Sequence, residues 1–266
     1  MATIRALVVR TAGTNCDQET KTAFERVGAK VHLAHVNELL RQRNELDAYQ
    51  IIAIPGGFTF GDDITAGRIL GNELKMKLRD QIERFLKRNG LMIGICNGFQ
   101  VLVKMGLLPG NSAWEPEATL ADNDSGKFEA RWSYLRQYSQ PSTGRRNCCV
   151  WTSRAPERLY LPVAHGEGKF IPRDGGVLQR LAENGQIVLH YCDAAGGRAE
   201  YPANPNGSVD AIAGICDVTG RIFGLMPHPE RFVTRTQHPR WTREPRQLMA
   251  DGLAIFQSGM DFLASA

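Results

Sequence analysis

An almost wholly apolar segment that runs straight into a glycine-rich turn is the feature of this sequence that most restricts its fold. Leu91–Ile95 (LMIGI) predicts a strand of the kind that is buried on both faces, which is typical of parallel sheets. The chain then passes through Gly94-Ile95-Cys96-Asn97-Gly98, which predicts a sharp turn from strand to helix. Such a strand belongs in a sheet that helices cover.

The rest of the chain repeats this alternation of apolar strands and amphipathic helices. Strands are predicted at residues 4–10, 31–36, 50–54, 187–191, 209–216 and 221–226, and helices at 17–27, 73–88 and 246–263. The middle, residues 111–160, is less regular, with possible strands at 127–135 and 148–153. Because nothing resembles a linker, we predict one α/β domain over residues 1–266, an open, mostly parallel sheet covered by helices, with a decorated middle.

Composition and charge exclude several classes of protein. With 42% hydrophobic and 23% charged residues, the 266-residue chain is typical of a globular protein. A net charge of +4 does not by itself predict a nucleic-acid partner. No apolar run approaches the roughly 20 residues of a membrane-spanning helix, and the start lacks a signal-peptide pattern. Six cysteines without metal-type spacing predict reduced thiols in the cytoplasm and no metal site.

Cys96 occupies the nucleophile position of a G-x-S-x-G elbow, with a thiol in place of the hydroxyl. Side chains at positions 94 and 98 would collide in so tight a turn, which explains the two glycines. A cysteine at a helix N-terminus is favoured as a thiolate, and the N–H of Asn97 would face a developing oxyanion. Taken alone, the segment equally fits a small buried cysteine between packing glycines.

A second segment, Pro227-His228-Pro229-Glu230, directly follows the predicted strand at 221–226. A cysteine nucleophile needs a base, and the base needs an orienting carboxylate. In an extended His-x-Glu segment both side chains point to one side, at the edge of the sheet where open α/β folds bind ligands. The alternative is a surface His–Glu pair in a loop.

The strand predicted at 50–54 ends in Pro55-Gly56-Gly57, whose backbone is able to approach a ligand at the same edge of the sheet. The sequence contains neither the dinucleotide-binding glycine pattern nor a phosphate-binding loop. ATP chemistry therefore has no predicted place in this chain.

A cysteine at an elbow, a Gly-Gly loop and a late His-x-Glu together resemble the class I (triad) glutamine amidotransferases. More narrowly, the chain is similar to the glutaminase subunits of phosphoribosylformylglycinamidine synthases, through GGFTFGDD, GICNGFQ, SGKFEARW, PVAHGEGKF, NPNGS and MPHPER in this order. The resemblance extends from about residue 5 to the C-terminus. It implies a flavodoxin-like, class I glutamine amidotransferase fold.

Carried over by position, the resemblance implies a catalytic triad and an oxyanion hole. Cys96 would be the nucleophile, His228 its base and then acid, and Glu230 the residue that orients His228. Gly57 and Asn97 would donate the oxyanion N–H groups.

The resemblance also implies a substrate-binding set. Gln100 would help to hold glutamine, and the loop His165-Gly166-Glu167 would bind its α-amino and α-carboxylate groups, largely through backbone. The side chain of His165 receives no catalytic role, because it equally fits a structural histidine. The remaining cysteines are interpreted as structural or incidental: Cys16, Cys148, Cys149, Cys192 and Cys216.

The implied reaction is hydrolysis of L-glutamine to glutamate and ammonia through a Cys96 thioester. Ammonia would pass to a partner synthetase that converts formylglycinamide ribonucleotide to formylglycinamidine ribonucleotide in de novo purine biosynthesis. The resemblance places ATP and magnesium in that synthetase, no cofactor in this chain, and a small third subunit in the same complex. No nucleic acid and no membrane are expected as partners.

Three alternatives stay open on the sequence. The chain is a glutaminase serving a different synthetase, a cysteine hydrolase of similar fold, or a non-enzymatic scaffold or nucleic-acid module. Related hydrolases often place the histidine directly after the elbow, whereas Asn97 follows Cys96 here. The arginine-rich segment 231–246, with Phe232 and Trp241 interleaved, suggests a docking surface for the synthetase, and equally fits a solvated loop before the last helix.

Overall fold

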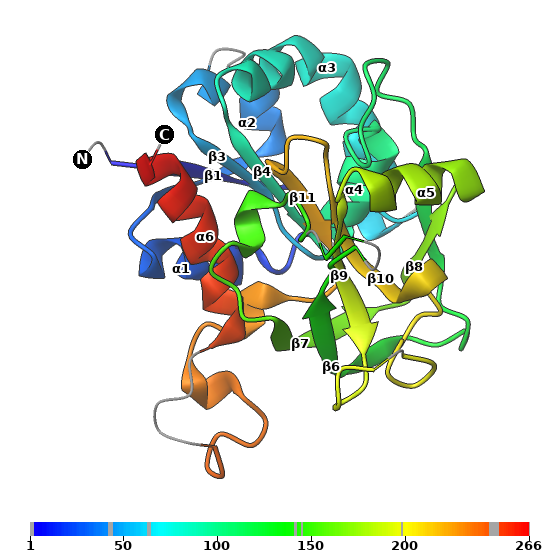
Figure 1. Ribbon diagram of the computed structural model, residues 1–266. Coiled ribbons are helices and arrows are strands. Elements are labelled where there is room, and N and C mark those ends of the chain that lie inside the picture. The colour runs from blue at the N-terminus through cyan, green and yellow to red at the C-terminus, as the bar shows by residue number, and fades with distance from the viewer. Residues whose placement is uncertain are drawn as a thin grey trace.

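The computed structural model describes residues 3–41, 45–62, 65–140, 143–144, 146–197, 199–244 and 250–265. A nine-stranded sheet in the order β2-β1-β3-β4-β11-β10-β9-β6-β7 runs through the molecule, with helices on both sides of its parallel part (Figure 1). Within the described part of the chain, no helix combines the length and the apolar character needed to cross a membrane.

Five neighbouring strands of the sheet are parallel. They are β2 (Lys30–His35), β1 (Arg5–Arg10), β3 (Ile51–Ile54), β4 (Leu91–Ile95) and β11 (Ile222–Leu225). Every residue of β3, β4 and β11 is buried, as predicted for strands that helices cover on both faces. The register pairs Ile54 with Gly94 and Leu225 with Ile95, so the three strands end at one edge of the sheet.

The remaining strands extend the sheet in antiparallel fashion. They are β10 (Ile212–Cys216), β9 (Ile187–Cys192), β6 (Glu129–Gln137) and β7 (Arg158–His165). A separate antiparallel pair consists of β5 (Ala118–Asp122) and β8 (Glu167–Pro172). The sequence did not predict β5, β7 or β8, and it placed β6 slightly too early. The irregular middle region thus supplies strands to both sheets.

The described residues form six α-helices around the sheet. They are α1 (Asp17–Arg26), α2 (Val36–Arg41), α3 (Arg68–Lys87), α4 (Asn97–Met105), α5 (Gly175–Glu183) and α6 (Asp251–Ser265). Short 3₁₀ helices lie at Glu45–Ala48, Thr59–Asp62, Val150–Thr152, Val209–Ala211, Pro229–Arg231 and Arg235–Gln237. Residues 245–249, which include the start of the predicted final helix, lie outside the described residues.

The predicted strand at 148–153 is wrong. Residues Val150–Thr152 form a short 3₁₀ helix, because Trp151 is fully buried and its indole N–H donates to the carbonyl of Arg221 at 2.9 Å. This ring packs edge-on against Phe24 of α1, which in turn contacts Phe256 of α6 with ring centroids 4.8 Å apart. Aromatic packing, rather than strand pairing, therefore decides the local structure here.

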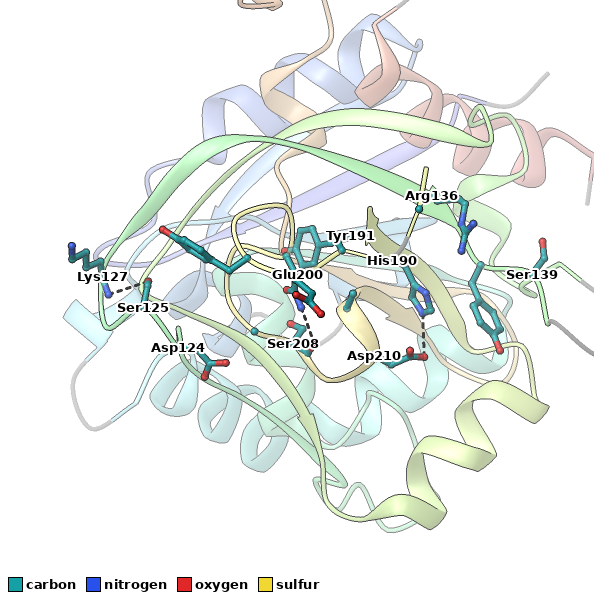
Figure 2. Close-up of a pocket in the computed structure, with 17 residues that line it drawn as sticks. Asp124, Ser125, Lys127, Arg136, Ser139, His190, Tyr191, Glu200, Ser208 and Asp210 are labelled. Carbon is teal, nitrogen blue, oxygen red and sulfur yellow. Dashed lines mark hydrogen bonds and ion pairs between the residues drawn. The ribbon is translucent and has the colours of Figure 1, made fainter. Parts of the chain in front are cut away.

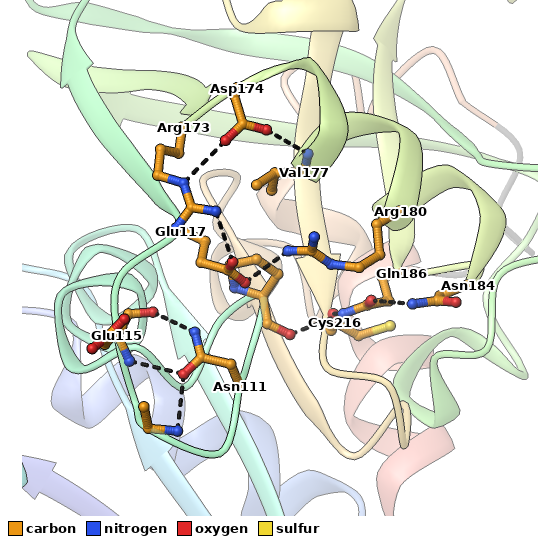
Figure 3. A network of polar contacts seen from close by, with 12 residues as sticks. Asn111, Glu115, Glu117, Arg173, Asp174, Val177, Arg180, Asn184, Gln186 and Cys216 are labelled. Atoms are coloured by element: carbon orange, nitrogen blue, oxygen red, sulfur yellow. Dashed lines mark hydrogen bonds and ion pairs between the residues drawn. The ribbon is translucent and has the colours of Figure 1, made fainter.

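A polar network fixes the start of β5 (Figure 3). The buried carboxylate of Glu117 accepts hydrogen bonds from Arg173, at 3.2 Å, and from Arg180 of α5, at 2.8 Å. Asp174 caps α5 by accepting from the N–H of Val177 at 3.0 Å. These contacts tie the β5–β8 pair to α5, and this pair carries part of the wall of the site described next.

Candidate active site

Cys96 lies at the turn between β4 and α4 in a strained conformation, with φ 51° and ψ −107°. A Cβ atom on Gly94 would lie 2.5 Å from the carbonyl oxygen of Gly98, and one on Gly98 would lie 1.8 Å from that of Ile54. Both contacts involve backbone that has no room to move. The steric reason for the two glycines, inferred from the sequence, therefore holds.

The thiol of Cys96 lies at the N-terminal end of α4. Its residue is 6% exposed and precedes the first turn of α4, whose unpaired N–H groups carry partial positive charge. The sulfur lies 3.7 Å from the carbonyl oxygen of Ala164, at the end of β7. β7 thus forms one side of the site.

His228 and Glu230 form a buried, hydrogen-bonded pair next to Cys96. His228 Nδ1 lies 2.6 Å from Glu230 Oε1, and both residues are at most 2% exposed. Burial by itself lowers the pKa of His228, but the charge of Glu230 and then the interactions with Cys96 outweigh it and hold this pKa well above its usual value. His228 Nε2 is buried without a hydrogen-bond partner among the described residues, which leaves it free for the reacting groups.

A second thiol lies against the same pair. Cys16 Sγ is 3.9 Å from His228 Nδ1, and the ligand atoms of Cys16, His228 and Glu230 all lie within 4.8 Å of one another. The arrangement favours hydrogen bonding over metal binding, because Glu230 already accepts from Nδ1 and the guanidinium of Arg231 donates to Cys16 Sγ at 3.1 Å.

The two backbone donors expected for an oxyanion are both available. Gly57 faces Thr14 in an isolated bridge whose hydrogen bonds run from Phe58 N to Gly13 O and from Asn15 N to Gly56 O. The N–H of Gly57 takes no part in this bridge. The N–H of Asn97 is the first amide of α4, so it has no intrahelical carbonyl to donate to.

The side chain of Asn97 has a role that the sequence did not reveal. Buried at 1% exposure, its Oδ1 accepts from the N–H and the hydroxyl of Thr59, at 3.3 and 2.7 Å. Its Nδ2 donates to Asp62 Oδ1 and to Gln100 Oε1, both at 2.9 Å. One amide thus holds the loop that carries Gly57 against the elbow. The next residue of the loop motif, Asp63, lies outside the described residues.

Gln100 and the 165–167 loop line the cavity at Cys96, but their polar groups are largely engaged within the protein. Gln100 Nε2 donates to the carbonyl of Glu167, and the main chain and side chain of Asn123 donate to the carbonyls of Gly166 and His165, at 2.9 and 2.8 Å. Asn123 was not predicted from the sequence. It shapes the loop from a position 42 residues away from His165.

The ring of His165 belongs to this scaffold. Its Nδ1 lies 3.1 Å from Asn123 Oδ1, an oxygen that only accepts, so Nδ1 carries the proton. Burial, followed by the nearby charge of His228, lowers the pKa of His165 to about 3. The ring is therefore neutral at physiological pH and holds the loop in place.

Two small cavities meet at Cys96 and share Gly57, Phe58, Phe128 and Ala164. The first, about 170 Å³, carries three carboxylates, those of Asp62, Asp122 and Glu167. The second, about 240 Å³, contains His228 and Arg231. Burial, followed by the charge of Glu167, raises the pKa of Asp62 to about 6. One end of the site thus suits a cationic group, and the other holds the base.

Comparison with known proteins places this geometry in a family. A family model for the CobB/CobQ-like glutamine amidotransferase domain matches residues 3–263. The phosphoribosylformylglycinamidine synthase subunit PurQ of Dehalococcoides mccartyi is 49% identical over 98% of this chain and 98% of its own. This chain belongs to the PurQ family of glutamine amidotransferases.

Other PurQ relatives agree. The PurQ subunit of Methanococcus maripaludis is 41% identical over 97% of each chain. A chain in the solved structure of PurLQS from Thermotoga maritima is 29% identical, with a TM-score of 0.74 over 98% of this chain and all of that one. The family and the α/β fold predicted from the sequence are thereby confirmed.

A larger cavity, about 880 Å³, lies elsewhere in this PurQ-family chain (Figure 2). It is lined by residues of β6, β9 and the segment before β10, among them Arg136, His190 and Asp210. None of the triad residues reaches it. The larger volume of this cavity therefore does not mark it as the candidate active site.

The arginine-rich segment is buried near its start and exposed over most of its second half, where Arg240 and Arg243 lie at the surface. Phe232 is 1% exposed and packs edge-on against Trp132 with ring centroids 5.3 Å apart. Arg231 points inward to Cys16 and also pairs with Glu19 at 3.5 Å. Trp241, at 42% exposed, does lie at the surface. Residues 245 and 246 lie outside the described residues.

Proposed function

We propose that this chain hydrolyses L-glutamine at Cys96, with His228 as proton carrier and Glu230 as the carboxylate that orients it. The chain belongs to the PurQ family. As a glutaminase subunit, it supplies ammonia for the conversion of formylglycinamide ribonucleotide to formylglycinamidine ribonucleotide. One observation carries the residue assignment. A thiol on a strained elbow adjoins a buried histidine whose Nδ1 is fixed by Glu230 and whose Nε2 has no hydrogen-bond partner among the residues that the structure describes.

In the first half-reaction, Cys96 Sγ attacks the γ-carbonyl carbon of glutamine and forms a tetrahedral oxyanion. The N–H groups of Gly57 and Asn97 hold the negative oxygen. His228 gives its Nε2 proton to the amide nitrogen, the C–N bond breaks, and ammonia leaves behind a Cys96 thioester. Glu230 stabilises the imidazolium that forms before this transfer.

In the second half-reaction, water attacks the thioester while His228 Nε2 takes one of its protons. The C–S bond breaks, glutamate leaves, and the thiol–imidazole pair is restored. The two steps together consume one glutamine and one water and yield one glutamate and one ammonia. The cavity at His228 has room for this water beside the base.

The cavity with the three carboxylates supports one orientation of the bound glutamine. The α-ammonium group of glutamine lies toward Asp62 and Glu167, and the γ-amide reaches Cys96. Gln100 and the carbonyls of His165-Gly166-Glu167 then shape the seat around the α-carbon, as the sequence resemblance implies. The side chains of Asn97 and Asn123 hold these groups in place through hydrogen bonds.

We further propose how the chain works with partners. It acts as a single domain, with 111–160 as its decorated middle, inside a complex with a synthetase subunit and a small third subunit. The synthetase binds ATP, magnesium and the ribonucleotide. PurLQS of Thermotoga maritima supports the complex. The six free cysteines support a reducing compartment, the cytoplasm.

The test is glutamate release from glutamine by the wild type and by Cys96→Ala, each alone and with the synthetase, small subunit, ATP and ribonucleotide. We expect release in the assembled complex and a loss of at least about 10⁴-fold in Cys96→Ala, as expected for removal of a nucleophile. Cys192→Ala, which removes a buried thiol from β9, is the matched control and retains full activity.

Two outcomes contradict the proposal. Full activity in Cys96→Ala removes the triad assignment. Release that depends on a different acceptor substrate, and not on formylglycinamide ribonucleotide, assigns the chain to another synthetase.

A further inference from the structure

Cys16 is a buried thiol that lies beside the catalytic histidine but that the proposed mechanism does not use. It is 1% exposed and lies in the first loop of the chain, 212 residues away from His228 in the sequence. Its backbone N–H donates to the carbonyl of Gly56 at 3.2 Å, which joins this loop to the one that carries Gly57. The sulfur is then held beside the catalytic histidine.

The position of Cys16 in its helix argues for a role of the side chain. Cys16 is the N-cap residue of α1, where Ser, Thr, Asp and Asn are favoured because their side chains bond to the free N–H groups. Its thiol makes no such bond. It lies instead 3.9 Å from His228 Nδ1, on the side of the ring that faces Glu230.

Neighbouring groups enclose the sulfur. Arg231 donates to it at 3.1 Å, and Asn15 Oδ1 accepts from it at 3.1 Å. A Cβ atom on Gly56 would lie 3.2 Å from the sulfur and 2.8 Å from His228 Cε1, so this glycine closes the space beside both. The titratable and charged groups that act on His228 or Cys16 are Cys96, Glu230, Arg231 and His165.

Two other roles fit the contacts less well. A metal centre at Cys16, His228 and Glu230 would require a thiolate, but burial raises the pKa of the Cys16 thiol. It would also break the short bond between His228 and Glu230. A second nucleophile is disfavoured for the same reason, since the neutral thiol is a poor one.

We propose that Cys16 is a positioning residue for the His228–Glu230 pair. Its sulfur, fixed by Arg231, packs against the Nδ1 side of the imidazole and keeps water away from the Nδ1–H···Glu230 hydrogen bond. Without this contact, water reaches Glu230 and screens its charge. The His228 imidazolium is then less stable, and a Cys96 thiolate is stabilised less by its positive charge.

The experiment measures the reactivity of Cys96 rather than turnover. The rate of alkylation of Cys96 by iodoacetamide is followed against pH, peptide by peptide in a mass spectrometer, for the wild type, Cys16→Ala, Cys16→Ser and Cys192→Ala. Cys192→Ala is the matched control, because Cys192 is also buried, at 2% exposed, and the substitution likewise removes a thiol. No glutamine or partner is needed, so the outcome is independent of the proposed function on which the idea rests.

We expect the midpoint of Cys96 alkylation to move to higher pH by about 0.5–1 pH unit in Cys16→Ala, the effect of a partly screened charge on a neighbouring titration. Below the midpoint this is a three- to tenfold slower reaction. Cys16→Ser moves the midpoint the same way by less, and Cys192→Ala does not move it. In the assembled complex, kcat for glutamine falls in Cys16→Ala while KM stays constant.

A spectroscopic readout separates positioning from simple filling of space. In protein labelled with ¹⁵N-histidine, the Nδ1 proton of His228 exchanges slowly with water in the wild type and in Cys192→Ala, and faster in both Cys16 variants. If Cys16→Ala does not fold, Cys16→Ser decides alone. A folded Cys16 variant that has the wild-type midpoint of Cys96 alkylation and the wild-type exchange rate of the His228 Nδ1 proton overturns the proposal.

Discussion

Replacing Asn97 by alanine tests whether its side chain holds the oxyanion loop. The substitution leaves the backbone N–H of residue 97 in place, so the donor itself is not removed. It deletes the amide that joins Thr59, Asp62 and Gln100 to the elbow. Any loss of catalysis then reports on the position of Gly57 and not on the chemistry of residue 97.

The contacts of Asn97 set the expected size of the effect. Four hydrogen bonds are lost at a residue that is 1% exposed, one of them to the carboxylate of Asp62. At about 1 kcal/mol for each neutral bond and about 1.5–3 kcal/mol for the one to a charged group, less some rescue by water, the free energy of unfolding falls by about 3–5 kcal/mol. If Gly57 then no longer reaches the oxyanion, kcat falls by about 10²-fold.

Urea unfolding and steady-state glutaminase kinetics in the assembled complex measure the two effects separately. Asn147→Ala is the control, because Asn147 also accepts two hydrogen bonds, from Cys149 N and the Thr152 hydroxyl, but lies away from the active site. It lowers stability and leaves kcat unchanged. Thr59→Val removes only the 2.7 Å hydrogen bond between the Thr59 hydroxyl and Asn97 Oδ1. Its stability and its kcat lie between those of the wild type and of Asn97→Ala.

A folded Asn97→Ala variant with kcat within twofold of the wild type would refute this role of the side chain, since the loop then holds itself. An equally strong loss of kcat in Asn147→Ala would refute it too, because the loss would follow global stability and not the loop.

Three further predictions concern the pocket and the scaffold. Asp62 ionises with a pKa of about 6, so glutamine binding to Cys96→Ala, measured by calorimetry, weakens as the pH falls through about 6. The double variant that also carries Asp62→Asn binds weakly at every pH, and a pH profile parallel to that of Cys96→Ala alone would argue against this contact. Gly98→Ala places a Cβ 1.8 Å from a carbonyl oxygen and lowers the free energy of unfolding, measured by thermal unfolding, by about 3 kcal/mol or more. Gly175→Ala, whose Cβ meets nothing within 4 Å, changes it by less than about 1 kcal/mol, and equal effects would refute the steric account. Glu117→Gln weakens its pairing with Arg173 and Arg180 and lowers the free energy of unfolding by about 1–2 kcal/mol at unchanged kcat, and an undiminished urea midpoint would contradict this.

Local patterns were enough to predict the parallel part of the fold. The strands β3, β4 and β11 are short apolar runs next to turn signals, so their burial and their common edge follow from the sequence. Local patterns failed where packing overrode propensity. The helix α3 begins at Arg68 and not at 73, because Gly71, which weakens a helix by itself, lies in close contact with Val101 and Lys104 of α4.

The sequence by itself determined the elbow at Cys96 and the His228–Glu230 pair, because the chemistry of each depends on residues one or two positions apart. Only the tertiary structure decided which distant groups surround them. Cys16 reaches His228 across 212 residues, and Asn123 reaches His165 across 42. A thiol or an amide at such a position carries no local signal, since its partner is chosen by how strands and loops pack at the common edge of the sheet.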